Sequence, residues 1–203
     1  TMATATITTS NAAYRKNYEP MMPSVYFAEY PYLFRTPYKM EDGKCPKEYF
    51  TQFDEIFKKI VDPSMVAAIM MEPVQGEGGV FPATDEFIQG IRKFCDEKGI
   101  LMLLDEVQAG WGRCGDFMCY MTYGIKPDVV SMAKAMGGGM PIGGIACTEE
   151  TVLDGSYAIQ RPFVLVTKTD APLSTAAQAF FDYATSTAAN DLIKAAGAVP
   201  VAK

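Results

Sequence analysis

The sequence predicts an α/β domain with a mostly parallel sheet that helices cover on both faces. Two short apolar runs, at residues 66–71 and 100–105, are predicted as buried strands. A segment with helical periodicity joins them, and the connections on either side are tight. Strand, helix and strand in this order form a right-handed βαβ unit, in which the two strands lie parallel.

The two predicted helices have recognisable ends. Residues 46–61 place their aromatic and aliphatic side chains on one face, with a proline in the first turn. Thr84 is predicted to cap the second helix, because its hydroxyl can accept a hydrogen bond from the first turn. Gly99 is predicted to end that helix. Residues 127–133 predict a third strand, and residues 1–45 predict strand and loop.

Composition and charge exclude several classes of protein. The chain has 203 residues, of which 49% are hydrophobic and 21% charged, as in globular rather than disordered proteins. The net charge of −6 argues against nucleic acid as a partner. The apolar runs are shorter than the roughly 18 residues of a membrane span, and we find no secretory signal pattern. We therefore expect no membrane partner and a cytoplasmic protein.

Histidine and cysteine usage narrows the chemistry. The chain contains no histidine, which removes Ser-His-Asp and Cys-His hydrolases and the HExxH zinc enzymes. Its five cysteines are odd in number and include no CxxC pair, so we expect reduced thiols without a metal site or disulfide framework. Acid-base chemistry must then come from Lys, Asp, Glu, Tyr or Cys.

All three predicted strands end in stretches that combine glycine with polar or charged residues. These are EPVQGEGG at 72–79, DEVQAG at 105–110 and AKAMGGG at 133–139. In open parallel sheets, ligands bind beyond the carboxyl ends of the strands. One such ending is ordinary, but three at the same edge predict a functional site.

Lys134 and Asp105 suggest what that site does. A buried lysine is a nucleophile toward carbonyl groups, because desolvation favours its neutral amine. The alternative is a surface lysine whose amine simply reaches the solvent. A carboxylate facing a pyridine nitrogen keeps that nitrogen protonated, which is what pyridoxal phosphate (PLP) chemistry requires. The pair therefore predicts a PLP site.

The motifs resemble a known family. EPVQGEGG, LLDEVQAGWGRCG, YGIKPD and SMAKAMGGGMPIGG, in this order, resemble the class III PLP-dependent aminotransferases of fold type I, over residues 1–148. YPYLFRTPY is most similar to the 4-aminobutyrate and acetylornithine branch. The resemblance implies part of a fold type I large domain with pyridoxal 5′-phosphate as cofactor. It also implies amino transfer from an ω-amine donor to a 2-oxo acid such as 2-oxoglutarate.

The resemblance also implies roles for individual residues. Lys134 would be the Schiff-base lysine and proton carrier, and Asp105 would pair with the ring nitrogen. Val107 would pack on the ring face, and Gln108 would approach the ring hydroxyl. An ordinary core position remains an alternative for Val107.

Two glutamates complete the predicted site. Glu72 would lie near the cofactor and support the residues that contact it. Glu77 resembles the gating glutamate that lets one site accept both an ω-amine donor and 2-oxoglutarate. A solvated loop acid remains the alternative for Glu77.

The end of the chain departs from the family. All 13 methionines precede residue 148, and composition changes sharply beyond it. Residues 149–203 resemble the carboxyl-terminal end of phosphate-binding proteins of ABC importers, which predicts a chimera joined near residues 148–150. The family is homodimeric, but we expect this chain to fold poorly and turn over little. A non-catalytic fragment or, from the tail, a phosphate-type solute-binding protein are the alternatives.

Overall fold

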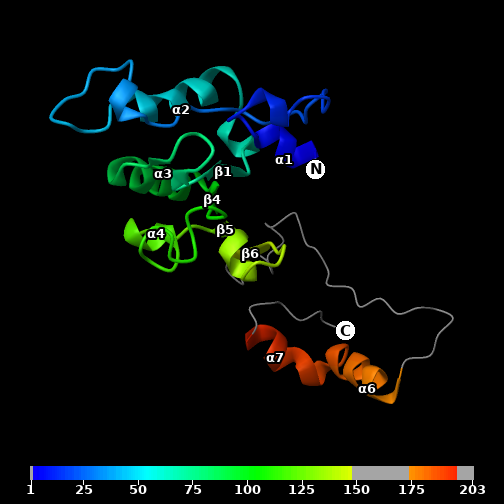
Figure 1. The fold of residues 1–203 in the computed structure, drawn as a ribbon. Helices are drawn as coiled ribbons and strands as arrows, with labels where there is room; N and C mark the ends of the chain where they lie inside the picture. Colours follow the sequence, from blue (N-terminus) through cyan, green and yellow to red (C-terminus); the bar gives the residue numbers. More distant parts are fainter. Residues whose placement is uncertain (1, 148–173, 196–203) are drawn as a thin grey trace. The chain divides into compact units, whose positions relative to one another are not determined.

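The computed structural model describes residues 2–147 and 174–195, and it contains two compact units, Thr1–Ile145 and Ala146–Lys203 (Figure 1). The family-like segment 1–148 and the first unit therefore nearly coincide. The predicted join at residues 148–150 lies outside the described residues. So does most of the tail that resembles a phosphate-binding protein.

The two predicted helices of the first unit are confirmed. Helix α2 spans Glu48–Lys59 and α3 spans Asp85–Lys98. The Thr84 hydroxyl accepts a hydrogen bond from the backbone N–H of Phe87 at 3.2 Å, which caps the first turn of α3. Gly99 ends α3 with φ +67°, a left-handed conformation that a residue without Cβ adopts at no steric cost.

The predicted parallel sheet is also confirmed. Strands β1 (Ala68–Met71), β4 (Leu101–Asp105), β5 (Val129–Met132) and β6 (Gly144–Cys147) lie in the order β1-β4-β5-β6. Strand β1 is parallel to β4, and β4 is parallel to β5. In this register Met71 lies beside Leu104, and Asp105 lies beside Ser131. The tips of three strands therefore meet at one edge.

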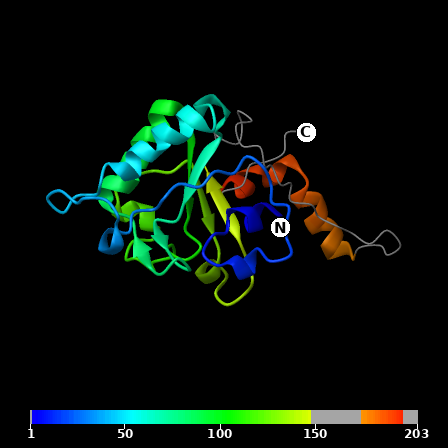
Figure 2. The same ribbon diagram turned by 90° about the horizontal axis from the view of Figure 1, so that it is seen from above.

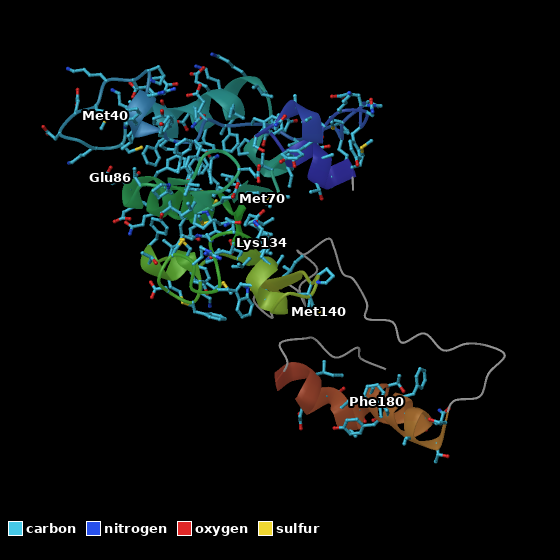
Figure 3. All side chains as sticks on the ribbon, in the orientation of Figure 1. Met40, Met70, Glu86, Lys134, Met140 and Phe180 are labelled. Carbon is cyan, nitrogen blue, oxygen red and sulfur yellow. The ribbon has the colours of Figure 1, made fainter. Side chains whose placement is uncertain are left out.

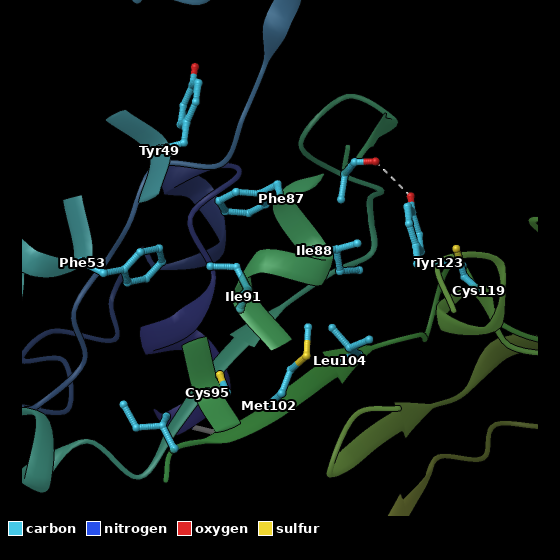
Figure 4. Packing of buried hydrophobic residues seen from close by; sticks show 13 residues of the cluster. Tyr49, Phe53, Phe87, Ile88, Ile91, Cys95, Met102, Leu104, Cys119 and Tyr123 are labelled. Atoms are coloured by element: carbon cyan, nitrogen blue, oxygen red, sulfur yellow. Dashed lines mark hydrogen bonds between the residues drawn. The ribbon is translucent and has the colours of Figure 1, made fainter. Parts of the chain in front are cut away.

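One face of the sheet carries the core. Ile88, Ile91 and Cys95 of α3 pack over Met102 and Leu104 of β4, and all five are buried (Figure 4). Helix α2, cyan in Figure 2, runs beside α3 and adds aromatic side chains to the same cluster. This burial of apolar surface is the main source of stability for the unit.

The opposite face of the sheet is only partly covered by the described residues. Leu101, Leu103 and Asp105 alternate with the buried residues of β4, and all three are half-buried. The sequence predicted helices on both faces, and the long helices α2 and α3 belong to the same core cluster. Strand β4 therefore has one fully packed face and one face open to solvent.

The segment before α2 differs from the prediction of strand and loop. Its first regular element is helix α1 (Met2–Ile7), and the segment contains no strand among residues 2–45. Side-chain hydroxyls support this helix, because Thr6 Oγ1 donates to Met2 O at 2.9 Å. The backbone N–H of Met22 then donates to Thr6 Oγ1 at 3.0 Å, which ties the following loop to α1.

A short hairpin lies between β1 and α3. Strands β2 (Val74–Gln75) and β3 (Phe81–Pro82) are antiparallel, and the predicted glycine-rich stretch forms the turn between them. The phenol of Tyr123 donates to the carbonyl oxygens of Pro73, at 3.3 Å, and of Ala83, at 3.2 Å. Both ends of the hairpin are therefore fixed to the core, and the dashed line at Tyr123 in Figure 4 marks one of these two bonds.

The second unit contains helices α6 (Thr175–Ala184) and α7 (Asn190–Ala195) in its described part. Helix α6 carries the aromatic residues Phe180, Phe181 and Tyr183. Two of its aromatic side chains are exposed to solvent: Phe180 (labelled in Figure 3) is 65% exposed and Tyr183 is 47% exposed. In the part of the chain that the structure describes, the helices are too short or too polar to cross a membrane.

Candidate functional site

A cavity of about 2050 Å³ runs along β1 beside α2 and the residues before it, and reaches the carboxyl ends of β1 and β4. It is larger than the roughly 300–1,000 Å³ of ordinary small-molecule pockets, in keeping with the partly covered face of the sheet. Every site residue predicted from the sequence lines this one cavity: Glu72, Glu77, Asp105, Val107, Gln108 and Lys134. The predicted convergence of the strand tips is therefore found.

Asp105 is the last residue of β4 and lies on the open face of the sheet. One carboxylate oxygen, Oδ1, accepts a hydrogen bond from the backbone N–H of Val107 at 3.0 Å. The other oxygen has no hydrogen-bond partner among the described residues. Asp105 is therefore a half-buried carboxylate at the end of the strand. One of its oxygens is hydrogen-bonded to the backbone, and the other can accept a hydrogen bond from a ligand.

Lys134 (labelled in Figure 3) follows β5 and begins a 3-10 turn, Lys134–Gly137. Its backbone has φ +50°, in the left-handed region. Its amine donates a hydrogen bond to Gln108 Oε1, so the tips of β4 and β5 are linked by these two side chains. Of the two alternatives for Lys134, the described residues agree with the surface lysine, because Lys134 is exposed.

Glu72 follows β1 at a position beside Asp105, since Met71 and Leu104 are register partners. Its carboxylate accepts the backbone N–H of Gly76 at 2.8 Å. Burial raises the pKa of Glu72, and the charges of Asp105 and Glu77 add to this while Lys134 opposes it. The side chains at the three strand tips are therefore close enough to influence each other electrostatically.

Glu77 lies in the hairpin turn and is exposed. Its Oε2 accepts a hydrogen bond from the phenol of Tyr14 at 3.2 Å, and this contact raises the pKa of the Tyr14 phenol. Tyr14 was not singled out from the sequence, because it lies far along the chain without a motif around it. The contact shows that residues before α2 reach the mouth of the cavity.

Glu106, which is fully buried, was not among the site residues predicted from the sequence. Its side chain is 0% exposed and accepts the backbone N–H groups of Cys119 and Tyr120, each at 2.7 Å. Burial raises the pKa of Glu106, although these two hydrogen bonds oppose the shift. Strand alternation could have identified it, since it puts Glu106 on the side of Met102 and Leu104, where a carboxylate needs partners.

The donors around the cavity fit a pyridine-type cofactor. An amine and a carboxylate come from neighbouring strand tips, with the apolar Val107 between them in the chain. Ser131 Oγ, beside Asp105 in the sheet, is buried without a hydrogen-bond partner among the described residues. Ser131 Oγ and the second Asp105 oxygen can therefore both form hydrogen bonds at the edge of the sheet where the ring nitrogen is predicted to lie.

Comparison with known protein families identifies the family to which the chain belongs. A family model described as Aminotransferase class-III matches residues 1–155. The chain belongs to the class III aminotransferases. This confirms the family predicted from the motifs. The match extends to residue 155, beyond the residue 148 at which the predicted resemblance ended.

The curated relatives of this class III segment are named acetylornithine aminotransferase and succinylornithine transaminase. The acetylornithine aminotransferase of Gloeobacter violaceus is 40% identical over 162 residues, which are 80% of this chain and 33% of that protein. The succinylornithine transaminase of Citrobacter koseri is 38% identical over 138 residues, which are 68% of this chain and 29% of that protein. The chain thus spans about a third of the length of these relatives.

Solved structures confirm the fold. An (S)-enantioselective omega-transaminase from Thermomicrobium roseum matches with a TM-score of 0.63 at 29% identity, over 77% of this chain and 35% of that one. An amine transaminase from an uncultivated Pseudomonas species, solved with PLP bound, matches with a TM-score of 0.64 at 27% identity, over 75% and 36%. The predicted fold type I is therefore confirmed, and PLP is the cofactor of this family.

Proposed function

We propose that this chain is part of a PLP-dependent aminotransferase that moves an amino group from an ω-amine donor to a 2-oxo acid such as 2-oxoglutarate. The observation that carries the proposal is the shared cavity, in which the Lys134 amine and the Asp105 carboxylate come from neighbouring strand tips. Family membership supports the reaction class. The names of the curated relatives favour a donor of the acetylornithine type over 4-aminobutyrate.

In this proposal Lys134 binds the cofactor and moves the proton. Its amine is the nucleophile toward a carbonyl, and the same nitrogen can later accept and return a proton within the cavity. Gln108 Oε1 accepts a hydrogen bond from the amine and thereby directs it toward the tip of β4. Bound PLP supplies an electron sink for charge that develops on the substrate.

In this proposal the Asp105 carboxylate stabilises the positive charge of the protonated ring nitrogen. Its committed oxygen, bonded to Val107 N–H, fixes the carboxylate on the open face, and its second oxygen is the one that would hold a ring N–H. Val107 supplies an apolar surface beside this pair, and Glu72 lies close enough to modulate it. We propose Glu77 as the gate, since it lies in the hairpin turn at the cavity and is already bonded to Tyr14.

We propose that turnover by the 203-residue chain is low. Lys134 is exposed, and the cavity of about 2050 Å³ admits water freely. Electrostatic stabilisation of developing charge is much weaker where water reaches the reacting atoms. Cofactor attachment is therefore a better test of the site than steady-state activity.

The test is borohydride reduction of the purified chain with added PLP, followed by mass mapping of the labelled peptide. We expect the label on Lys134, because its amine is the one that lines the cavity beside Asp105. Lys134→Ala should abolish both the label and the visible absorption of the bound cofactor.

The matched control is Lys126→Ala, which removes another exposed lysine close to β5. This variant should keep the label and the absorption. Label on a lysine other than Lys134, or no label on the unaltered chain, would contradict the proposed site.

A further inference from the structure

We propose that Glu106 is a positioning residue that closes the loop 106–120 and thereby fixes Asp105 and Gln108 for the cofactor. The inference rests on the proposed function and adds to it a residue that does not itself line the cavity. The observation behind it is a fully buried carboxylate whose contacts lie at the far end of the loop that carries the site.

The two ends of this loop are joined by one side chain. Glu106 Oε2 accepts the N–H of Cys119, 13 residues further on, and Oε1 accepts the N–H of Tyr120, each at 2.7 Å. The carboxylate is 0% exposed, so water does not compete for either bond. Charge-assisted hydrogen bonds of this length are stronger than those between neutral groups. Glu106 therefore acts as a clamp on the loop.

The inside of the loop is built around the same residue. The backbone N–H of Gly110 donates to Glu106 O at 2.9 Å. A Cβ at Gly110 would lie 2.9 Å from Glu106 O, 3.1 Å from Met118 Sδ and 3.2 Å from Glu106 Oε2. Position 110 therefore needs a glycine, because the clamp leaves no space for a side chain.

The clamp is directly connected to the site through the chain. Asp105 and Glu106 are adjacent and point to opposite sides of the strand, so movement of one displaces the other. Val107 N–H donates to Asp105, and Gln108 accepts from Lys134. If Glu106 lost its partners, the turn that aligns Asp105 and Gln108 would lose its anchor.

A carboxylate suits this role better than an amide. Two backbone N–H donors need two acceptor oxygens, which a glutamate side chain provides. A glutamine offers one acceptor and presents an NH₂ donor to the second backbone donor. One buried donor would then be unsatisfied, which lowers the folding equilibrium constant by about 10- to 100-fold.

The test is the affinity of the full chain for PLP, measured from the visible absorption of the bound cofactor in Glu106→Gln and in the unaltered chain. We expect binding to the folded protein to weaken, with a change in the visible band as Asp105 moves, because the turn that aligns Asp105 and Gln108 is no longer anchored. Glu97→Gln, which neutralises an exposed acid of α3, is the matched control and should bind like the unaltered chain. Equal affinity and an equal band in Glu106→Gln would overturn the proposal.

Amide hydrogen exchange without cofactor provides a second measurement. The N–H groups of Cys119 and Tyr120 should be protected in the unaltered chain and should exchange faster in Glu106→Gln, since they lose an acceptor. Unchanged exchange would overturn the clamp. If the unaltered chain fails to bind PLP, the proposed function fails, while the exchange result still decides on the clamp.

Gly110→Ala covers the case in which Glu106→Gln does not fold. The added methyl group disturbs the clamp from inside the loop and keeps the carboxylate. We expect weaker PLP binding and faster exchange at Cys119 and Tyr120, in the same direction as for Glu106→Gln. A Gly110→Ala chain with unchanged affinity and exchange would count against the proposal.

Discussion

The two faces of strand β4 differ sharply in burial. On one face Met102 and Leu104 are buried under α3, and on the other Leu101, Leu103 and Asp105 are half-buried beside the cavity. The strand is only five residues long, so the two environments are separated by the thickness of one backbone.

This difference in burial shows how one strand can both stabilise the core and present side chains to a ligand. Side chains alternate between the faces, so each residue on the packed face fixes its neighbours on the open face. Asp105 can remain accessible because Leu104 and Glu106, on either side of it, are held in the interior. Rigidity comes from one face, and the groups that meet a ligand lie on the other.

The largest expected effect is on stability, and it tests the contrast directly. Leu104→Ala should lower the free energy of unfolding by about 2–5 kcal/mol, because it leaves a cavity beneath α3. Leu103→Ala removes the same atoms from the open face and should cost roughly 1 kcal/mol. Urea unfolding of both variants measures the difference. Equal losses would mean that the open face is as tightly packed as the other.

A smaller effect concerns pH and the packed face. The pKa of Glu106 is raised above its usual 4.5 by burial, so above pH 4.5 the folded state binds more protons than the unfolded state. The free energy of unfolding should therefore fall as pH rises from 4.5 through the raised folded pKa. Glu106→Gln should make this decline less steep, as measured by urea unfolding between pH 4.5 and neutrality. If the free energy of unfolding fell equally steeply with pH in Glu106→Gln, Glu106 would not be the group that causes the decline.

The smallest effect concerns the open face, and it requires no cofactor. Asp105→Asn should lower the pKa of Glu72, because a neighbouring negative charge is removed, and Lys134→Ala should raise it. NMR titration of the Glu72 carboxyl measures both shifts. Glu97→Gln, far from the cavity, should leave this pKa unchanged. Shifts of the same sign in the two site variants would show that these charges do not surround Glu72 as described.

Much of the first unit could be predicted from sequence because its signals are local. The cap at Thr84 and the left-handed end at Gly99 involve only neighbouring residues, and both are found. The apolar runs before residues 72 and 105 mark the strand tips, and parallel pairing follows from the helix between them. The chemistry of Lys134 and Asp105 predicted the site, the resemblance added the other four site residues, and all six line one cavity.

Other features depend on contacts that no local pattern reveals. The exposure of Lys134 depends on which segments cover the open face, and a motif around one residue does not report that. The contact between Tyr14 and Glu77 joins residues 63 positions apart. The helix at residues 2–7 is supported by threonine hydroxyls, although threonine favours strands when judged by propensity alone.

The predicted join near residues 148–150 stays a prediction. The family match runs through these residues to residue 155, and the first compact unit ends at Ile145; neither finding tests the join. A single genomic read across the codons for residues 148–150 would decide whether the segments before and after it are encoded together. Uninterrupted coverage would rule out an assembly artefact.

The left-handed backbone at Lys134 has a consequence for redesign. Residues that carry a Cβ lose roughly 1–2 kcal/mol in this conformation, whereas glycine does not, and the neighbouring Gly138 and Gly139 have positive φ as well. A glycine at position 134 would therefore relax the turn. Optimising the chain for thermal tolerance alone would favour that exchange, and it would remove the nitrogen to which the cofactor is expected to attach.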